Sequence, residues 1–320
     1  MRILPLILST LSFLSGAVSS GGQPLPRVSR EQVDEVIDLA WDMGEAWRKG
    51  ELPDPAFTEE ELAGLVRSLQ RALASNRLED LADLSTVLPP VLTALSQTES
   101  GRHYAAWLLQ RYDYAVVAGW SAEEAREKAA EAKAPPPPEA VDRFRDEYVM
   151  DLRVWRTRLA DRRPPDGAAR WLPLVKGVFA DRGVPEALVW LAEVESSFDP
   201  EAVSPVGARG LFQFMPETGE WMGLSLRPED ERLDPAKSAE AAAGYLRYLY
   251  ERFESWPLVL AAYNAGEGRV GRLLESRAAS DFNGIARFLP AETRMYVPKV
   301  FATIELREGG EAAALPPPRP

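Results

Sequence analysis

Two glutamates at the end of an apolar segment, Glu193 and Glu195, are the residues of this sequence best suited to acid–base chemistry. Pro185 suits the first turn of a helix, the residues after it are strongly apolar, and Pro200 ends the pattern. A mostly buried helix is therefore predicted, with Glu195 in its last turn. Apolar neighbours and the partial negative charge of a helix C-terminus both disfavour a carboxylate, so we expect a raised pKa for Glu195. A carboxylic acid still protonated near neutral pH can protonate a leaving-group oxygen.

Only one of the two glutamates can face a given pocket. Because Glu193 and Glu195 are two positions apart, they lie about 200° from one another around a helix. Periodicity alone favours neither of them, and a solvated helix end is the simpler interpretation of such carboxylates. The choice between them depends on the motifs that follow in the sequence.

Three short blocks follow the pair Glu195-Ser196. They read Ser-Pro-Val-Gly-Ala at residues 204–208, Gly-Leu-Phe-Gln-Phe-Met-Pro at 210–216 and Ala-Tyr-Asn-Ala-Gly at 262–266. In this order, the pair and the blocks resemble the lytic transglycosylase (SLT) domain, and the chain is most similar to the membrane-bound lytic murein transglycosylase D type. The similarity runs from about Trp171 to about Arg307. It implies that the acid and base of the family is Glu195 and not Glu193.

The resemblance implies a reaction that needs a single carboxylate, whereas ordinary glycosidases use two. Members of the family cleave the β-1,4 bond between N-acetylmuramic acid and N-acetylglucosamine in peptidoglycan glycan strands without water. The acid protonates the bridging oxygen, and the resulting carboxylate takes the proton of the muramoyl 6-hydroxyl, which attacks C1 and closes a 1,6-anhydro ring. No metal and no other cofactor is expected in such a site, which has to hold the sugar and exclude water.

The resemblance also implies a set of substrate-binding residues. They are Ser204, Gln213, Met215, Tyr263, Asn264 and Glu292. Ser204 matches the family serine near the acetamido group, and Glu292 belongs to a late block that is expected to line the groove. Phe212 stands where the family has a methionine, which leaves the mechanism intact but changes the shape of a subsite. Met215 matches the soluble type of the family better than the D type.

Each of these residues also has a purely structural interpretation. Tyr263 and Phe212 are typical of core aromatics, and Gln213 and Asn264 of helix caps. Glu292 is also explained as a surface carboxylate that pairs with Arg294.

Composition excludes several other classes of function. The chain has 320 residues and a formal net charge of -12, and such an acidic balance argues against nucleic acid as a partner. The absence of cysteine excludes disulfides, thiol catalysis and a lipid anchor on cysteine. His103 is the only histidine, so a catalytic triad or a histidine-rich zinc site would depend on one residue, and we interpret it as structural.

The first residues are typical of a secretory signal peptide. Arg2 precedes an apolar segment from Ile3 to Val18, which is followed by small residues and is too short for a comfortable membrane span. We therefore expect residues 1–20 to be a signal peptide and the protein to be exported to the periplasm or cell envelope of a bacterium. An uncleaved anchor is the less favoured alternative.

Residues 21–163 are predicted to form a helical N-terminal region of unassigned role. Capping-box patterns begin at Ser29, Thr58 and Ser121, and Pro135–Pro138 provides a stiff connector. Apolar stripes at helical spacing, and several large aromatics, are most simply core. They are Leu62, Leu65, Val66, Leu69 and Leu73; Val141, Phe144, Tyr148, Leu152, Trp155 and Leu159; and Trp107, Tyr112 and Trp120. The region could also bind a protein partner.

Residues 164–308 are predicted to form an all-α catalytic domain, and the resemblance implies a lysozyme-like fold for it. Pro164-Pro165-Asp166-Gly167 marks its start. Further helices are predicted at residues 171–179, 235–253, 256–263, 267–275 and 290–306. Residues 309–320 are rich in Gly, Ala and Pro and are expected to be a disordered tail.

Two alternatives to a lytic transglycosylase remain at this point. A goose-type lysozyme would use water on a related fold and would need a second acid placed to activate that water. A non-catalytic wall-binding or scaffold protein would use the N-terminal region to recruit a partner, although an intact Glu195 argues against it. Product analysis for a reducible end separates the two enzymes.

Overall fold

The computed structural model describes residues 72, 75–95, 99–131, 140–204, 207–310 and 315–319. Regular structure within these residues is helical, apart from two isolated β-bridges, Val203–Arg209 and Arg209–Phe214. The prediction of an all-α protein is confirmed. None of the helices in these ranges is both long enough and apolar enough to cross a membrane.

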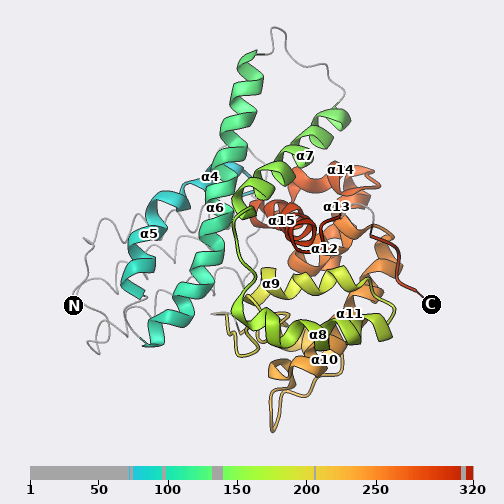
Figure 1. The fold of residues 1–320 in the computed structure, drawn as a ribbon. Helices are drawn as coiled ribbons and strands as arrows, with labels where there is room; N and C mark the ends of the chain where they lie inside the picture. Colours follow the sequence, from blue (N-terminus) through green and yellow to red (C-terminus); the bar gives the residue numbers. More distant parts are fainter. Residues whose placement is uncertain are drawn as a thin grey trace, which may run out of the picture. The chain divides into compact units, whose positions relative to one another are not determined.

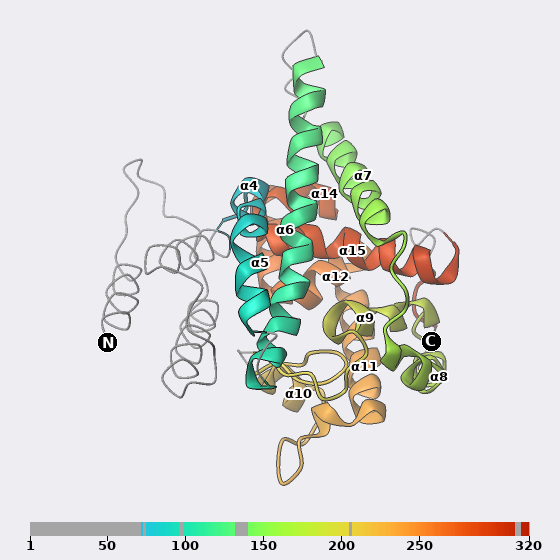
Figure 2. The ribbon, with the colours of Figure 1, turned by 60° about the vertical axis from the view of Figure 1, so that its left-hand side comes forward.

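The chain divides into two compact units, of which the first runs to Ala122 and includes Pro290–Glu292. Its helices are α4 (Leu78–Ala82), α5 (Leu84–Leu95) and the first part of α6 (Glu99–Glu131). Helix α5 lies along α6 in both views (Figures 1 and 2). The buried apolar residues of these helices form the core of the unit, and Leu88, Val91, Ala115, Val117 and Ala118 are among them.

Two predictions for α6 are wrong. The capping box expected at Ser121 is absent, because α6 continues unbroken through this residue to Glu131 and Ser121 is buried. A Ser-x-x-Glu pattern also fits a helix interior, so four residues cannot decide where a helix begins. Trp120 was expected in the core, yet 45% of it is exposed, and Tyr112, also expected there, is half-buried.

The second unit comprises Glu123–Leu289 and Thr293–Pro320. Its helices and short 3₁₀ turns are α7 (Ala140–Leu159), α8 (Asp166–Asp181), η2 (Glu186–Trp190), α9 (Leu191–Ser196), α10 (Pro216–Trp221), η3 (Glu231–Leu233), α11 (Pro235–Phe253), α12 (Trp256–Ala265), α13 (Glu267–Arg277), α14 (Phe282–Ile285), η4 (Ala286–Phe288) and most of α15 (Ala291–Glu308). The helices predicted from periodicity after residue 164 are all present (Figure 1).

Helix α15 supplies much of the core of this unit. Nearly every residue of its middle part is buried: Met295, Tyr296, Val297, Lys299, Val300, Phe301, Ala302, Thr303 and Ile304. A helix that is apolar around most of its circumference has to be surrounded by other elements. Its side chains are therefore available to position residues that come from several other helices.

Helix α7 belongs to the second unit by its contacts. Arg156 pairs with Glu305 of α15 at 2.6 Å, and the ring of Tyr148 meets Phe282 of α14 edge-on at 5.8 Å. Trp155 is fully buried, as predicted, with Lys299 over its ring. The boundary between the two compact units thus lies before α7. The domain boundary predicted from the sequence lies after α7, at residues 163–164, and it stays a prediction.

Residues 315–319 are held in place by hydrogen bonds to the second unit. The indole N–H of Trp256 donates to the carbonyl of Pro316 at 2.9 Å, and the N–H of Arg319 donates to the carbonyl of Gly183 at 2.7 Å. The expectation of a disordered tail is therefore wrong for these residues. Composition predicts disorder when little apolar surface can be buried, but it cannot foresee polar contacts made by the backbone.

Several predictions lie outside the described residues. They are the signal peptide at residues 1–20, the capping boxes at Ser29 and Thr58, the stripe from Leu62 to Leu73, and the connector Pro135–Pro138. The side chains of His103, Trp107, Val141 and Phe144 are also outside them.

Candidate active site

Glu195 lies in the last turn of α9, as predicted, although the segment before it begins as a 3₁₀ turn with Pro185 as its N-cap. The chain leaves α9 through two left-handed residues, Ser197 with φ 55° and Phe198 with φ 58°. The N–H of Phe198 donates to the carbonyl of Ala192 at 3.1 Å, which closes a Schellman-type end. Phe198 is fully buried, and its packing fixes the direction in which the helix stops.

The carboxylate of Glu195 meets the hydroxyl of Tyr296. Tyr296 lies on α15, is 2% exposed, and donates a hydrogen bond to Oε1 of Glu195. Glu195 itself is partly exposed. A partly exposed residue whose carboxylate is oriented by the protein meets two requirements of a general acid.

The carboxylate of Glu193 has a different partner. Its two oxygens accept hydrogen bonds of 2.9 and 2.7 Å from the guanidinium of Arg307, and the side chains are 8% and 6% exposed. Arg307 also donates to the carbonyl of Arg162 at 2.8 Å. The two glutamates thus face different groups, as the 200° argument predicted, and Glu193 is part of a buried ion pair and not of a solvated helix end.

The helix that carries Glu195 is tied to the loop that carries the next two motif blocks. The hydroxyl of Ser196 donates to the carbonyl of Leu211 at 2.9 Å. The carbonyl of Ala192, one turn earlier in the helix, is a second acceptor 3.1 Å from the same hydroxyl. From the other side, the hydroxyl of Tyr263 on α12 donates to the carbonyl of Phe212 at 2.8 Å. Three motifs far apart in the sequence therefore meet at residues 211–212.

The loop is folded on itself by its own polar side chains. Oγ of Ser204 accepts a hydrogen bond from the N–H of Ala208 at 3.0 Å, and Ser204 is buried. The amide nitrogen of Gln213 donates to the carbonyls of Gly210 at 2.9 Å and Ala202 at 3.2 Å. Gln213 has a left-handed φ of 48°, a conformation that costs free energy in a residue with a side chain and is often found at functional sites.

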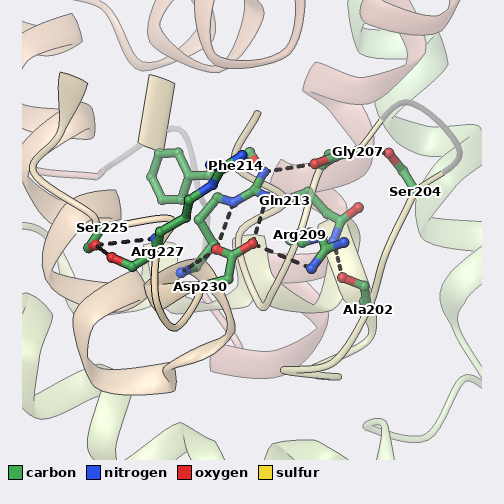
Figure 3. A network of polar contacts seen from close by, with 11 residues as sticks. Ala202, Ser204, Gly207, Arg209, Gln213, Phe214, Ser225, Arg227 and Asp230 are labelled. Atoms are coloured by element: carbon green, nitrogen blue, oxygen red, sulfur yellow. Dashed lines mark hydrogen bonds and ion pairs between the residues drawn. The ribbon is translucent and has the colours of Figure 1, made fainter. Parts of the chain in front are cut away.

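The buried guanidinium of Arg232 binds the backbone of the loop. Arg232 is 4% exposed, and its Nη1 donates to the carbonyls of Gly207 at 2.7 Å and Phe214 at 2.8 Å. Its Nε and Nη2 donate to the carboxylate of Asp230 at 3.0 and 2.8 Å. Figure 3 shows Asp230 at the centre of this network. Hydrogen bonding from Arg232 lowers the pKa of Asp230 below its usual value.

Asp230 also forms an ion pair with Arg209, a residue of the loop. Its Oδ2 lies 3.4 Å from Nη1 of Arg209, whose backbone bridges to Phe214 (Figure 3). Gly210, with φ 79°, passes so close to Arg232 that a Cβ there would lie 1.8 Å from the carbonyl oxygen of Arg232. Only glycine fits this position. Sequence reasoning missed Asp230 and Arg232, because no local pattern marks an arginine that will be buried.

Tyr263 is placed to remain a neutral donor. Burial raises its pKa well above the usual value, and the negative charge of Glu195 adds to this effect. Tyr245 packs against it at 5.4 Å between ring centroids, and burial together with Glu267 likewise raises the pKa of Tyr245. Neither hydroxyl loses its proton in the pH range in which proteins are usually active.

A line of aromatic rings leads from Tyr263 to the surface. Tyr245 contacts the ring of Trp221 edge-on at 6.0 Å, and Trp221 meets Tyr248 at 4.7 Å. Trp221, at the end of α10, is 56% exposed. The aromatic cluster around Tyr245 therefore reaches the surface at Trp221.

The remaining predicted site residues have structural partners of their own. Oδ1 of Asn264 accepts a hydrogen bond from Thr293 at 2.7 Å, and Met215 is the N-cap residue of α10. Glu292 is grouped with the first unit and lies 3.5 Å from Arg111. Its expected alternative partner, Arg294, instead contacts Asp151 at 3.3 Å.

Comparison with known families identifies the part of the chain that contains this geometry. Residues 179–285 match the transglycosylase SLT domain. The match includes Glu195, the loop and Tyr263. Tyr296 and Arg307, the partners of the two glutamates, lie beyond it.

Curated relatives are similar to less than half of this chain, and the chain spans less than half of their length. The membrane-bound lytic murein transglycosylase D of Escherichia coli is 39% identical over 138 residues, which cover 41% of this chain and 30% of that protein. The soluble lytic murein transglycosylase of Salmonella typhimurium is 37% identical over 120 residues, which cover 35% of this chain and 19% of that protein. The solved lytic transglycosylase Slt of Pseudomonas aeruginosa aligns with 100% of this chain and 62% of that chain, at 19% identity and a TM-score of 0.40.

Proposed function

We propose that the SLT domain makes this protein a peptidoglycan lytic transglycosylase, with Glu195 as its single acid and base. Protonated Glu195 gives its proton to the oxygen between N-acetylmuramic acid and N-acetylglucosamine as the bond from C1 to that oxygen breaks. The carboxylate then takes the proton of the muramoyl 6-hydroxyl, whose oxygen bonds to C1. The products are a free 4-hydroxyl on N-acetylglucosamine and a 1,6-anhydromuramoyl end, and no water is consumed.

The observation that carries this proposal is the different surroundings of the two glutamates. Glu193 uses both carboxylate oxygens to bind Arg307 in a nearly solvent-free ion pair. Glu195 is partly exposed and lies where three motifs meet. A proton shuttle must reach the substrate, and this requirement favours Glu195 over Glu193.

The surrounding residues support the two states that Glu195 has to adopt. The hydroxyl of Tyr296 can donate to the carboxylate once it has formed and so keeps it in position for the 6-hydroxyl. Tyr263 stays neutral beside it, so no second negative charge develops in the site. Positioning of this kind keeps the base close to the proton that it has to remove.

We further propose that the glycan strand is bound by the motif residues. They are Ser204, Gln213, Met215, Tyr263, Asn264 and Glu292. The exposed ring of Trp221 is proposed as an additional contact for a sugar. Because peptidoglycan surrounds bacterial cells, the protein is proposed to act in the periplasm or cell envelope, with residues 1–20 as the export signal.

Product analysis tests the proposal. Purified peptidoglycan is digested with the full chain, and the muropeptide ends are identified by mass in ordinary and in ¹⁸O-labelled water. Anhydromuramoyl ends without label are expected. Reducing muramic acid ends that carry the label would instead assign a lysozyme-type hydrolase. Binding of peptidoglycan without any cleavage, by a chain that is fully folded, would assign a scaffold protein.

A further inference from the structure

Residues 315–319 read Leu-Pro-Pro-Pro-Arg, and this composition restricts the backbone strongly. Proline fixes its own φ near -65°, and a residue that precedes proline is held to extended or polyproline II conformations. Each residue from Leu315 to Pro317 precedes a proline, and so does Arg319. The segment is therefore biased to polyproline II, which has three residues per turn. Pro316 and Arg319 then lie on the same side of it.

Trp256, one of a pair of packed aromatic rings, contacts the first of these two residues. The indole N–H of Trp256, the first residue of α12, donates to the carbonyl of Pro316 at 2.9 Å. The ring of Tyr250 on α11 lies 4.6 Å from the ring of Trp256. Grooves that bind proline-rich segments are generally lined by aromatics. A donor such as indole N–H suits a polyproline II backbone, which has carbonyls without internal partners.

The second residue is held by its backbone. The N–H of Arg319 donates to the carbonyl of Gly183 at 2.7 Å, and its carbonyl accepts from Nη1 of Arg247 at 2.8 Å. Gly183 has φ 71°, and a Cβ on it would lie 2.7 Å from the carbonyl oxygen of Arg319. The end of α8 therefore admits this backbone because residue 183 is glycine.

The side chain of Arg319 adds a contact that is specific to arginine. Its Nη2 donates to the carbonyl of Ala180 near the end of α8 at 3.1 Å. The partial negative charge at a helix C-terminus favours a cation at this position. The two anchor points are thus one polyproline II turn apart, and the second selects for a positive charge.

We propose that Gly183, Arg247, Tyr250 and Trp256 form a recognition site for proline-rich segments of the pattern Pro-x-x-Arg, occupied in this chain by its own residues 315–319. The site is distinct from Glu195 and does not depend on the transglycosylase function. Pro316, Pro317 and Arg319 are exposed, so the segment contributes recognition contacts and little core. A tethered ligand has a high effective concentration, and it keeps the site closed to ligands in solution.

The test removes the tethered segment and supplies it as a peptide. A chain that ends at residue 310 is titrated with a peptide of residues 312–320, and binding is followed by calorimetry and by tryptophan fluorescence. Saturable binding to the shortened chain is expected, with at least about tenfold weaker binding to the full chain. A peptide with alanine in place of Pro316, Pro317 and Pro318 is expected not to bind.

A matched variant locates the site. Trp256→Phe in the shortened chain keeps an aromatic ring but removes the N–H, and binding is expected to weaken about tenfold, as loss of one good hydrogen bond predicts. Should the shortened chain be insoluble, alanine at residues 316–319 of the full chain opens the same site for the same peptide. Absence of binding, equal binding of the alanine peptide, or failure of both proteins to fold would overturn the proposal, the last because the segment would then be part of the core.

Discussion

The hydroxyl of Tyr296 donates a hydrogen bond to Oε1 of Glu195, across 101 positions of sequence. We expect Tyr296→Phe to lower kcat about tenfold on a soluble glycan substrate with little change in KM, because the ring still packs while the carboxylate loses its orienting contact. Unfolding measurements control for packing. An equal fall in kcat after Tyr248→Phe, which removes a hydroxyl outside the contact with Glu195, would show that the effect is not specific.

The two glutamates are expected to respond in opposite ways to the same substitution. Glu195→Gln should reduce cleavage of peptidoglycan at least about 100-fold and leave the free energy of unfolding nearly unchanged, because the amide keeps the shape but cannot shuttle a proton. Glu193→Gln should mainly lower stability, because it leaves Arg307 buried without a matching charge. Cleavage assays and denaturant titrations of both variants provide the measurement. A stable but inactive Glu193→Gln would contradict the choice of Glu195 as the acid and base.

Arg232 is expected to be essential for the conformation of the loop that carries the motif blocks. Asp230→Asn removes the charge that Arg232 faces and should cost about 3 kcal/mol of unfolding free energy, since a buried ion that loses its partner is strongly destabilising. Cleavage should fall as well, because Ser204 and Gln213 lie on this loop. Lys237→Met, which breaks an exposed ion pair with Glu231, is the matched control and should leave the free energy of unfolding nearly unchanged.

The same ion pair predicts a pH dependence of stability. The pKa of Asp230 is lowered in the folded protein, so its contribution is complete above the unfolded value of about 3.9 and is lost as the pH falls through the lower, folded value. The difference in unfolding free energy between the protein and Asp230→Asn should be constant above about pH 5 and shrink below about pH 4. A difference that grows on acidification would contradict the assignment.

Truncation tests where the catalytic unit begins. A fragment of residues 140–320 should unfold cooperatively, because it retains the contacts of α7 with α14 and α15. A fragment of residues 165–320 removes Trp155, which is fully buried, and should be less stable by several kcal/mol. Thermal and denaturant unfolding of the two fragments provides the measurement. Equal stability would place the boundary at residues 163–164, as the sequence predicted.

Trp221 tests the proposed contact with sugar. Trp221→Ala should raise KM several-fold with little change in kcat, because an exposed ring contributes to binding and not to proton transfer. Leu174→Ala, on an apolar side chain that is 37% exposed in α8, is the control and should leave KM unchanged. A similar rise in KM in both variants would remove Trp221 from the substrate-binding surface.

The sequence by itself predicted the helices after residue 164 and the position of Glu195 in a last turn. Both depend on neighbours within a few positions, since the apolar spacing and the flanking prolines act over one or two turns. The order of the short motif blocks also identified the SLT domain. Local patterns were less reliable where they fit two structures, as the capping box at Ser121 and the disordered tail show.

Only the tertiary structure decided how the site is held together. Arg307 comes 114 positions after Glu193, and Tyr296 comes 101 positions after Glu195, so neither partner can be inferred from local spacing. In the sequence, Arg232 cannot be told from a surface arginine. It can bind the backbone of the loop because packing buries it beside Asp230. Contacts of this kind arise when helices formed independently are brought into one core, and the free energy of burying a charge then depends on the partner that the fold supplies.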